Sequence, residues 1–148
     1  MLAKNKKAYF DYHILEKIEA GVQLYGHEVK SVRQGKISLA GSYISVKDGE
    51  VFLINCDIAP YQPRNIPFDY NTKRDRKLLL HKKEIAKLAT KAEEKGVTVI
   101  PLRVYDTRGL IKLEIGIAKG KKKWDKRETI KRRDTERKMR QEMKKSGP

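Results

Sequence analysis

The chain has 148 residues, with 35 Lys and Arg against 19 Asp and Glu, a formal net charge of +16 and an isoelectric point near 9.9. This length suits one small domain with an extension, and the charge favours a polyanionic partner, RNA or DNA first, because contacts with phosphates release counterions. A membrane partner is not expected, since no segment approaches the roughly 18 apolar residues of a spanning helix and the basic C-terminal segment offers no wide apolar helical face.

The first elements follow from apolar periodicity. Residues 9–18 alternate apolar and polar side chains and predict a strand, which Gly21 ends. Residues 22–25 predict a second, short strand. Residues 26–33 predict a short helix that Gly35 closes.

A hairpin is predicted over residues 42–58, because the Asp-Gly pair at 48–49 is the signature of a two-residue type I′ turn. From Leu78 to Gly96 the period becomes helical, and His81 falls near the start of this helix. The apolar face of the predicted helix comprises Ile85, Leu88, Ala89 and Ala92.

Residues 97–105 and 110–118 predict the last two strands, and Pro101 predicts an edge position or a bulge in the first of them. The chain is therefore predicted to be mainly β with α, and to form a closed or nearly closed six-stranded β-barrel of the oligonucleotide-binding kind. One long inserted helix and one short helix accompany the barrel, and closure removes exposed edges. A split ferredoxin-like sandwich would need two helices of similar length.

Residues 119–148 form a distinct segment with fourteen Lys and Arg, five Asp and Glu, and four large apolar side chains. Such a composition cannot offset a backbone entropy cost of roughly 1–2 kcal/mol per ordered residue. We therefore predict an RNA-binding domain over 1–118 and a basic tail over 119–148 that is disordered when free and helical when bound. One helical face of the tail would carry Arg133, Arg137, Arg140 and Lys144.

The single cysteine, Cys56, excludes a disulfide framework and favours the cytoplasm. The histidines at 13, 27 and 81 lack the spacing of metal ligands, so no metal or cofactor is expected. A signal peptide is not expected, because the first residues are polar and basic. The sequence has no phosphate loop, no nucleophile elbow and no visible acid–base pair, so an enzyme is not expected.

Three basic clusters lie within the predicted domain, and each can be a solvated surface or a phosphate-binding surface. The third cluster precedes the predicted long helix, where positive charge opposes the helix dipole, so we favour phosphate binding there. The clusters are Lys4, Lys6 and Lys7 with Asn5; Lys30, Arg33 and Lys36; and Lys73, Arg74, Arg76 and Lys77.

Several tyrosines and one carboxylate on the predicted strands have two interpretations. Glu19 is by its spacing a surface carboxylate. The tyrosines can stack on bases, although half-buried packing is the commoner role in barrels. These tyrosines are Tyr12, Tyr25, Tyr43 and Tyr61.

The order and spacing of several motifs closely resemble the SsrA-binding protein family, also called small protein B. The most specific is GHEVKSVRQGK at 26–36, with NKKA at 5–8, RKLLLH at 76–81, GKK at 120–122 and DKR at 125–127. The resemblance covers essentially the whole chain.

The resemblance implies a non-enzymatic protein that binds the tRNA-like domain of transfer-messenger RNA. It also implies a tail that enters the decoding centre and messenger channel of the small ribosomal subunit during rescue of stalled ribosomes. A monomer is expected. The candidate RNA-contacting residues, from clusters and resemblance together, are Asn5, Lys6, Lys7, Tyr12, Glu19, Lys30, Arg33, Lys36, Arg76, Lys77 and Leu80. The candidate ribosome-contacting residues are Lys121, Lys122, Lys123, Trp124, Asp125, Lys126, Arg127, Arg133, Arg137, Arg140 and Lys144.

Two other classes of protein stay open. A structural ribosomal protein with a tail threaded into ribosomal RNA would have the same composition, but would stay on salt-washed ribosomes. A basic ribonuclease would need a catalytic acid–base pair, which the sequence does not display.

Overall fold

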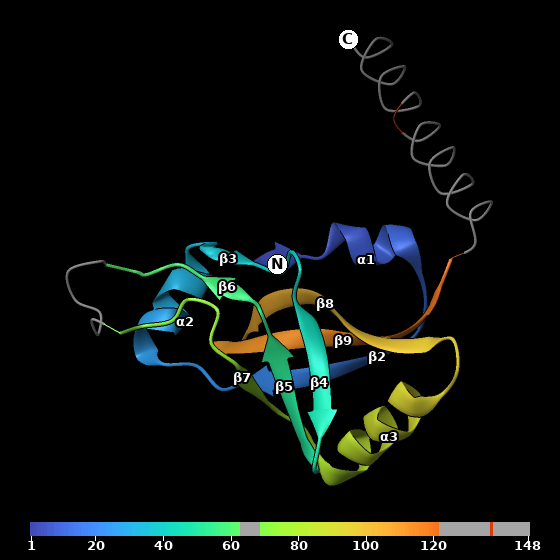
Figure 1. The fold of residues 1–148 in the computed structure, drawn as a ribbon. Helices are drawn as coiled ribbons and strands as arrows, with labels where there is room; N and C mark the ends of the chain where they lie inside the picture. Colours follow the sequence, from blue (N-terminus) through green and yellow to red (C-terminus); the bar gives the residue numbers. More distant parts are fainter. Residues whose placement is uncertain (63–68, 122–136, 138–148) are drawn as a thin grey trace.

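The computed structural model describes residues 1–62, 69–121 and Arg137, and Figure 1 shows the arrangement of their helices and strands. The prediction of a mainly β chain with helices is confirmed within these residues. In chain order the elements are β1 (Ala3–Lys4), α1 (Lys6–Asp11), β2 (Tyr12–Val22), α2 (Gly26–Arg33), β3 (Ile37–Ser38), β4 (Tyr43–Lys47), β5 (Glu50–Ile54), β6 (Asp57–Ile58), β7 (Arg76–Leu79), α3 (Lys82–Glu93), β8 (Val97–Thr107) and β9 (Leu110–Gly120).

The main sheet has seven antiparallel strands in the order β1-β8-β9-β2-β7-β5-β4, and β3 pairs with β6 in a separate ribbon. The sheet curls until β4 packs near β8, yet hydrogen-bonded pairing ends at β1 and β4, so the sheet is open. The sheet therefore differs from the predicted closed or nearly closed six-stranded barrel, because it has seven strands and is not closed. The strands that were missed span only two to four residues, too few for a period of two to be recognisable.

The three eleven-residue strands β2, β8 and β9 form the centre of the sheet and supply most of the core. Buried and exposed positions alternate along most of β2, whereas β9 is buried without interruption from Leu113 to Ala118. α3 adds Leu88, which is fully buried, and packs against β4 and β8. Buried residues of the central strands include Ile18, Ala20, Leu102, Val104, Ile111, Leu113, Ile115 and Ile117.

Both tight hairpins have the turn that their sequences demand. The turn between β4 and β5 has φ of 51° at Asp48 and 75° at Gly49, so the predicted Asp-Gly hairpin is confirmed. The turn between β8 and β9 repeats this geometry, with 51° at Arg108 and 80° at Gly109. The bulge expected at Pro101 is also present, because the register of β8 with β9 shifts between Pro101 and Arg103.

The N-terminal segment differs from the prediction. Residues 6–11 form α1 rather than the start of a strand, because the Asn5 side chain accepts a hydrogen bond from the Ala8 amide at 3.3 Å and caps the helix. The two strands expected over 9–18 and 22–25 are one strand, Tyr12–Val22. Gly21 lies inside it and pairs on both sides.

α2 has the predicted bounds of 26–33, whereas α3 begins later than predicted. Residues 76–79 form β7, which contains Arg76 and Lys77 of the third basic cluster and precedes the helix. His81 is the N-cap of α3, and its amide donates to Glu84 Oε1 at 3.1 Å. The prediction that this cluster faces the helix dipole is therefore wrong, and Ala92 on the expected apolar face is exposed.

Candidate nucleic-acid interface

Four neighbouring strands place one row of residues on the solvated face of the sheet. Tyr105 of β8 lies opposite Lys112 of β9, Lys112 lies opposite Gly21 of β2, and Gly21 lies opposite Leu79 of β7. Directly opposed residues share a face of the sheet. We call these four residues the Gly21 row. Its middle is open, because Gly21 has no side chain and Leu79 is 54% exposed.

An adjacent row joins three charged residues. Arg103 lies opposite Glu114, which lies opposite Glu19. Arg103 Nη2 lies 3.0 Å from Glu114 Oε2, and Lys17 Nζ lies 3.6 Å from Glu114 Oε1. Glu114 is thereby neutralised within the protein, whereas Glu19 is exposed.

Glu19 is held by a residue two strands away. The Tyr105 hydroxyl reaches past β9 and donates a hydrogen bond to Glu19 Oε2. Burial and the nearby Glu19 carboxylate raise the pKa of Tyr105 above its ordinary value, so its hydroxyl stays protonated and remains a donor. The surface carboxylate predicted at 19 therefore has a fixed orientation.

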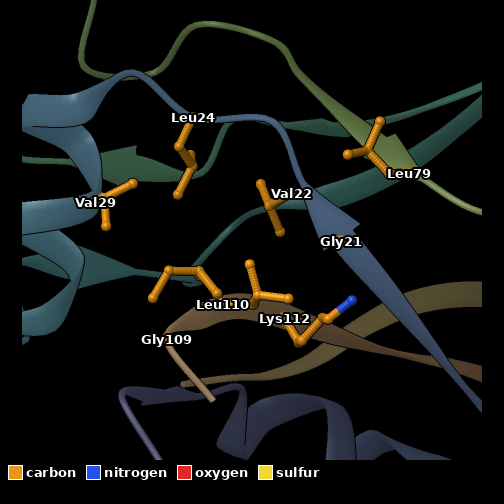
Figure 2. Close-up of a pocket in the computed structure, with 9 residues that line it drawn as sticks. Gly21, Val22, Leu24, Val29, Leu79, Gly109, Leu110 and Lys112 are labelled. Carbon is orange, nitrogen blue, oxygen red and sulfur yellow. The ribbon is translucent and has the colours of Figure 1, made fainter. Parts of the chain in front are cut away.

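Two hollows meet at the Gly21 row, and both include Gly21, Leu79 and Lys112 in their lining. The first, of about 300 Å³, is mostly apolar, and Figure 2 shows β2, α2 and β9 contributing to it. Its apolar side chains include Val22, Leu24, Val29 and Leu110. The second, of about 490 Å³, is more polar and is lined in addition by Glu19, Leu80, His81 and Glu84.

The second basic cluster has Lys30 and Arg33 on α2 and Lys36 just beyond it, and these three cations have different neighbours. Lys30 and Lys36 both point over the ring of Tyr61, with Nζ-to-centroid distances of 5.7 and 5.9 Å. Arg33 instead binds the turn between β8 and β9, since its Nη2 donates to the Gly109 carbonyl at 2.7 Å and its Nε to Asp106 Oδ2 at 3.1 Å. All three cations are exposed and can also contact phosphates.

Arg76 requires a correction, because its side chain is fully buried and cannot contact RNA directly. Its Nε and Nη2 donate to Glu28 Oε2 at 3.0 and 2.7 Å. Arg74 donates to both carboxylate oxygens of Glu28. These two arginines are therefore structural cations that fix α2 to the first residue of β7 and to the segment just before it.

Glu28 is the centre of this buried cluster. Its carboxylate also accepts hydrogen bonds from the Tyr25 amide at 2.8 Å and from the Tyr70 hydroxyl at 2.9 Å. Burial raises the pKa of Glu28, but the hydrogen bonds from Arg74, the Tyr25 amide and Arg76 outweigh it and lower the pKa to about 2. Glu28 is thus ionised at every physiological pH.

The N-terminal candidates surround other hollows. Asn5 is occupied by the cap of α1 and by a hydrogen bond from its Nδ2 to the Pro101 carbonyl at 2.9 Å. Lys6 and Lys7 are exposed and line a hollow beside β3, and Lys7 also shares a second hollow with Tyr12. Asn5 therefore supports this surface, and the two lysines present charge on it.

The remaining body candidates lie on or just after β7. Leu80 is partly buried and lines the polar hollow together with Glu19. Lys77 is exposed and pairs with Glu50 of β5 at 3.6 Å. Of the predicted set, the structure therefore brings Glu19 and Leu80 to one hollow and places Lys77 on a neighbouring strand.

Among the tail candidates, the structure describes Lys121 and Arg137. The Lys121 amide donates to the Asp11 carbonyl at 2.8 Å, which fixes the end of β9 beside α1, and Arg137 is exposed. The other tail candidates, and therefore the predicted cationic stripe, lie outside the described residues: Lys122, Lys123, Trp124, Asp125, Lys126, Arg127, Arg133, Arg140 and Lys144.

Sequence reasoning missed Tyr105, Lys112, Glu28 and Tyr70 as parts of this surface or its support. The first two become neighbours of Glu19 only through strand register, which no local pattern encodes. Glu28 did leave a signal, because it is the one acidic residue of α2.

Two other findings concern the residues that the structure describes. In that part of the chain no three His, Cys, Asp or Glu side chains gather where they could hold a metal ion. Nor is any helix there long and apolar enough to span a membrane.

Comparison with known proteins identifies a family. The model of the family described as "SmpB protein" matches residues 2–145. The SsrA-binding protein of Caldicellulosiruptor bescii is 54% identical over 97% of this chain and 90% of that protein. The SsrA-binding protein of Thermosipho africanus is 48% identical over 99% of this chain and 98% of that protein.

A solved structure has a similar fold. It is described as "tmRNA-SmpB: a journey to the center of the bacterial ribosome". The matching chain is 46% identical in sequence and aligns with a TM-score of 0.66, covering 81% of this chain and 84% of that chain.

Proposed function

Because the chain belongs to the SmpB protein family, we propose that it binds transfer-messenger RNA and acts with that RNA in the rescue of stalled ribosomes, in the cytoplasm. The observation that carries this proposal is the family match over residues 2–145, together with relatives named SsrA-binding protein at about half identity. The net charge of +16 suits two RNA partners, the transfer-messenger RNA and the ribosome.

The tRNA-like domain of the RNA is the part that the folded body binds. We place it on the solvated sheet face and the adjoining face of α2. This region offers three exposed cations and two hollows, and an RNA elbow needs both phosphate contacts and contacts with unstacked bases. The body residues in this proposal are Glu19, Lys30, Arg33, Lys36, Lys77 and Leu80, with Lys6, Lys7 and Tyr12 on the neighbouring surface and Asn5 as its support.

The sequence placed the division between body and tail after residue 118, and we move it to after Lys121. β9 continues to Gly120 and the Lys121 amide is still bound to α1, so the body includes both residues. Residues 122–148 then form the ribosome-contacting tail, which enters the decoding centre and messenger channel as a helix. Its dense positive charge suits a groove walled by phosphates.

A structural ribosomal protein is the less favoured alternative, because the matching relatives are named SsrA-binding protein. That name describes binding and no reaction, and our proposal accordingly contains no catalytic step. We expect a monomer that leaves ribosomes during a high-salt wash.

The test replaces Lys30 and Arg33 with Ala and measures binding to transfer-messenger RNA over a range of salt concentrations. Each lost phosphate contact should flatten the slope of log K against log salt by about 0.9 on duplex RNA and somewhat less on single strands. The control replaces Lys83 and Lys95, two exposed cations at α3 and after it, with Ala. Equal slopes for wild type and the Lys30/Arg33 variant would exclude α2 from the interface, and no binding by the wild type would refute the proposed function.

A further inference from the structure

Glu19 places an exposed negative charge on the surface that we propose for RNA. A carboxylate there repels phosphates, so it favours binding only if it accepts hydrogen bonds from the ligand. The hydrogen-bond donors that an unpaired nucleotide offers are base amino and imino groups and the ribose hydroxyl. The position of Glu19 inside a hollow, beside Leu80, favours a base.

The carboxylate has free acceptor capacity. Its Oε2 accepts from the Tyr105 hydroxyl, and within the described residues no other hydrogen bond or ion pair occupies Glu19. An ionised carboxylate has about four acceptor positions on its two oxygens. Both oxygens can therefore accept from a ligand while Tyr105 keeps the group in place.

A donor and an apolar wall stand next to this acceptor. Lys112 lies directly across the ladder from Gly21, two residues along β2 from Glu19, and lines both hollows. Because Gly21 has no side chain, the surface beside Lys112 is open. Leu79 bounds this opening on the opposite side of Gly21 (Figure 2). A Cβ at Gly21 would lie 3.3 Å from Leu79 Cβ, so a larger residue at position 21 would fill this opening.

We propose that this position binds the Watson–Crick edge of one unpaired guanine, an inference that rests on the proposed function. The N1–H and N2–H₂ groups of guanine lie side by side and can donate to the two oxygens of Glu19. The neighbouring O6 accepts from Lys112, and Leu79 contacts the ring.

The other bases match this set of groups less well. Adenine and cytosine each place a ring-nitrogen acceptor beside their amino group, so one oxygen of Glu19 would face a lone pair. Uracil has one imino donor between two carbonyl acceptors. A correct bidentate contact discriminates against a wrong base by about tenfold or more.

The first test is chemical footprinting on transfer-messenger RNA bound to the full-length protein. Kethoxal modifies N1 and N2 of unpaired guanines, and dimethyl sulfate modifies N1 of adenine and N3 of cytosine. We expect one kethoxal-reactive guanine to be protected by the wild type and exposed again in Glu19→Gln. Tyr105→Phe should restore part of its reactivity, because Tyr105 is a positioning residue for Glu19. Glu93→Gln, at an exposed carboxylate in the last turn of α3, should leave the protection unchanged.

The second test replaces the protected guanine with inosine, which lacks the N2 amino group, in a synthetic tRNA-like domain. The wild type should lose about tenfold in affinity, whereas Glu19→Gln should lose much less, because its partner group is already altered. Equal melting temperatures of the two proteins exclude a folding defect.

The outcomes separate the two proposals. If the wild type binds the RNA but protects no guanine, or protects an adenine or cytosine at this surface, the guanine assignment is wrong and the proposed function stands. Equal losses of affinity on inosine substitution for the wild type and Glu19→Gln would likewise overturn the guanine assignment. If the wild type does not bind the RNA at all, the proposed function itself fails.

Discussion

Glu28→Gln is expected to cost the body much of its stability, and to do so in a pH-dependent way. The substitution keeps the shape of the side chain but removes the negative charge that Arg74 and Arg76 share. Two guanidinium groups then remain without their anion, one of them fully buried. Breaking a buried pair from one side typically costs about 3–5 kcal/mol.

The pKa of Glu28 gives an independent magnitude. Folding lowers this pKa from its ordinary value of 4.5 to about 2. Since each pKa unit corresponds to about 1.4 kcal/mol, the ionised carboxylate contributes about 3 kcal/mol to the free energy of unfolding. The unfolded chain protonates first as the pH falls, so this contribution is complete above pH 4.5 and is lost progressively between pH 4.5 and 2.

Urea unfolding of the full chain, followed by circular dichroism at pH 7, 4 and 3, measures both effects. We expect wild type and Glu28→Gln to differ by about 3 kcal/mol at pH 7 and by much less at pH 3. The control is Glu50→Gln, because the exposed Glu50–Lys77 pair should contribute less than about 1 kcal/mol. A difference below 1 kcal/mol at pH 7, or one that stays the same at pH 3, would refute the reasoning.

Two further predictions concern packing and the tail. Gly116→Ala should lower the free energy of unfolding by about 1–3 kcal/mol, because its Cβ would lie 2.9 Å from Leu102 Cδ1 in the core. The matched control is Gly120→Ala, which has no atom within 4 Å of the new Cβ. Equal losses of stability for the two variants in urea titrations would contradict this packing. A chain that ends after Lys121 should keep most of its affinity for transfer-messenger RNA in filter binding but fail to support peptide tagging on stalled ribosomes; tagging at the wild-type rate would show that the tail is dispensable.

Local signals were sufficient where one short segment decides its own structure. The Asp-Gly pair at 48–49 requires positive φ at both positions, and the hairpin is there. The helix at 26–33 and the position of His81 near the start of α3 are likewise properties of a few adjacent residues. At Pro101 the missing amide already predicted the interruption of its strand.

Long-range pairing could not be read in this way. β1, β3 and β6 have two residues each and exist only because distant strands pair with them. The third basic cluster shows the same limit for function. From charge alone, Arg76 was predicted to bind phosphate. In the fold it instead pairs with Glu28, which lies 48 residues away in the sequence. The Gly21 row depends in the same way on register across four strands.

The hydrogen bond from the Lys121 amide to Asp11 fixes the point from which the remaining 27 residues leave the body. From that anchor a chain of this length reaches about 40 Å as a continuous helix and about 90 Å when fully extended. Once the body holds its RNA, the tail samples only a volume of that radius. Its encounter with a second site is then governed by an effective concentration rather than by the amount of protein in the cell.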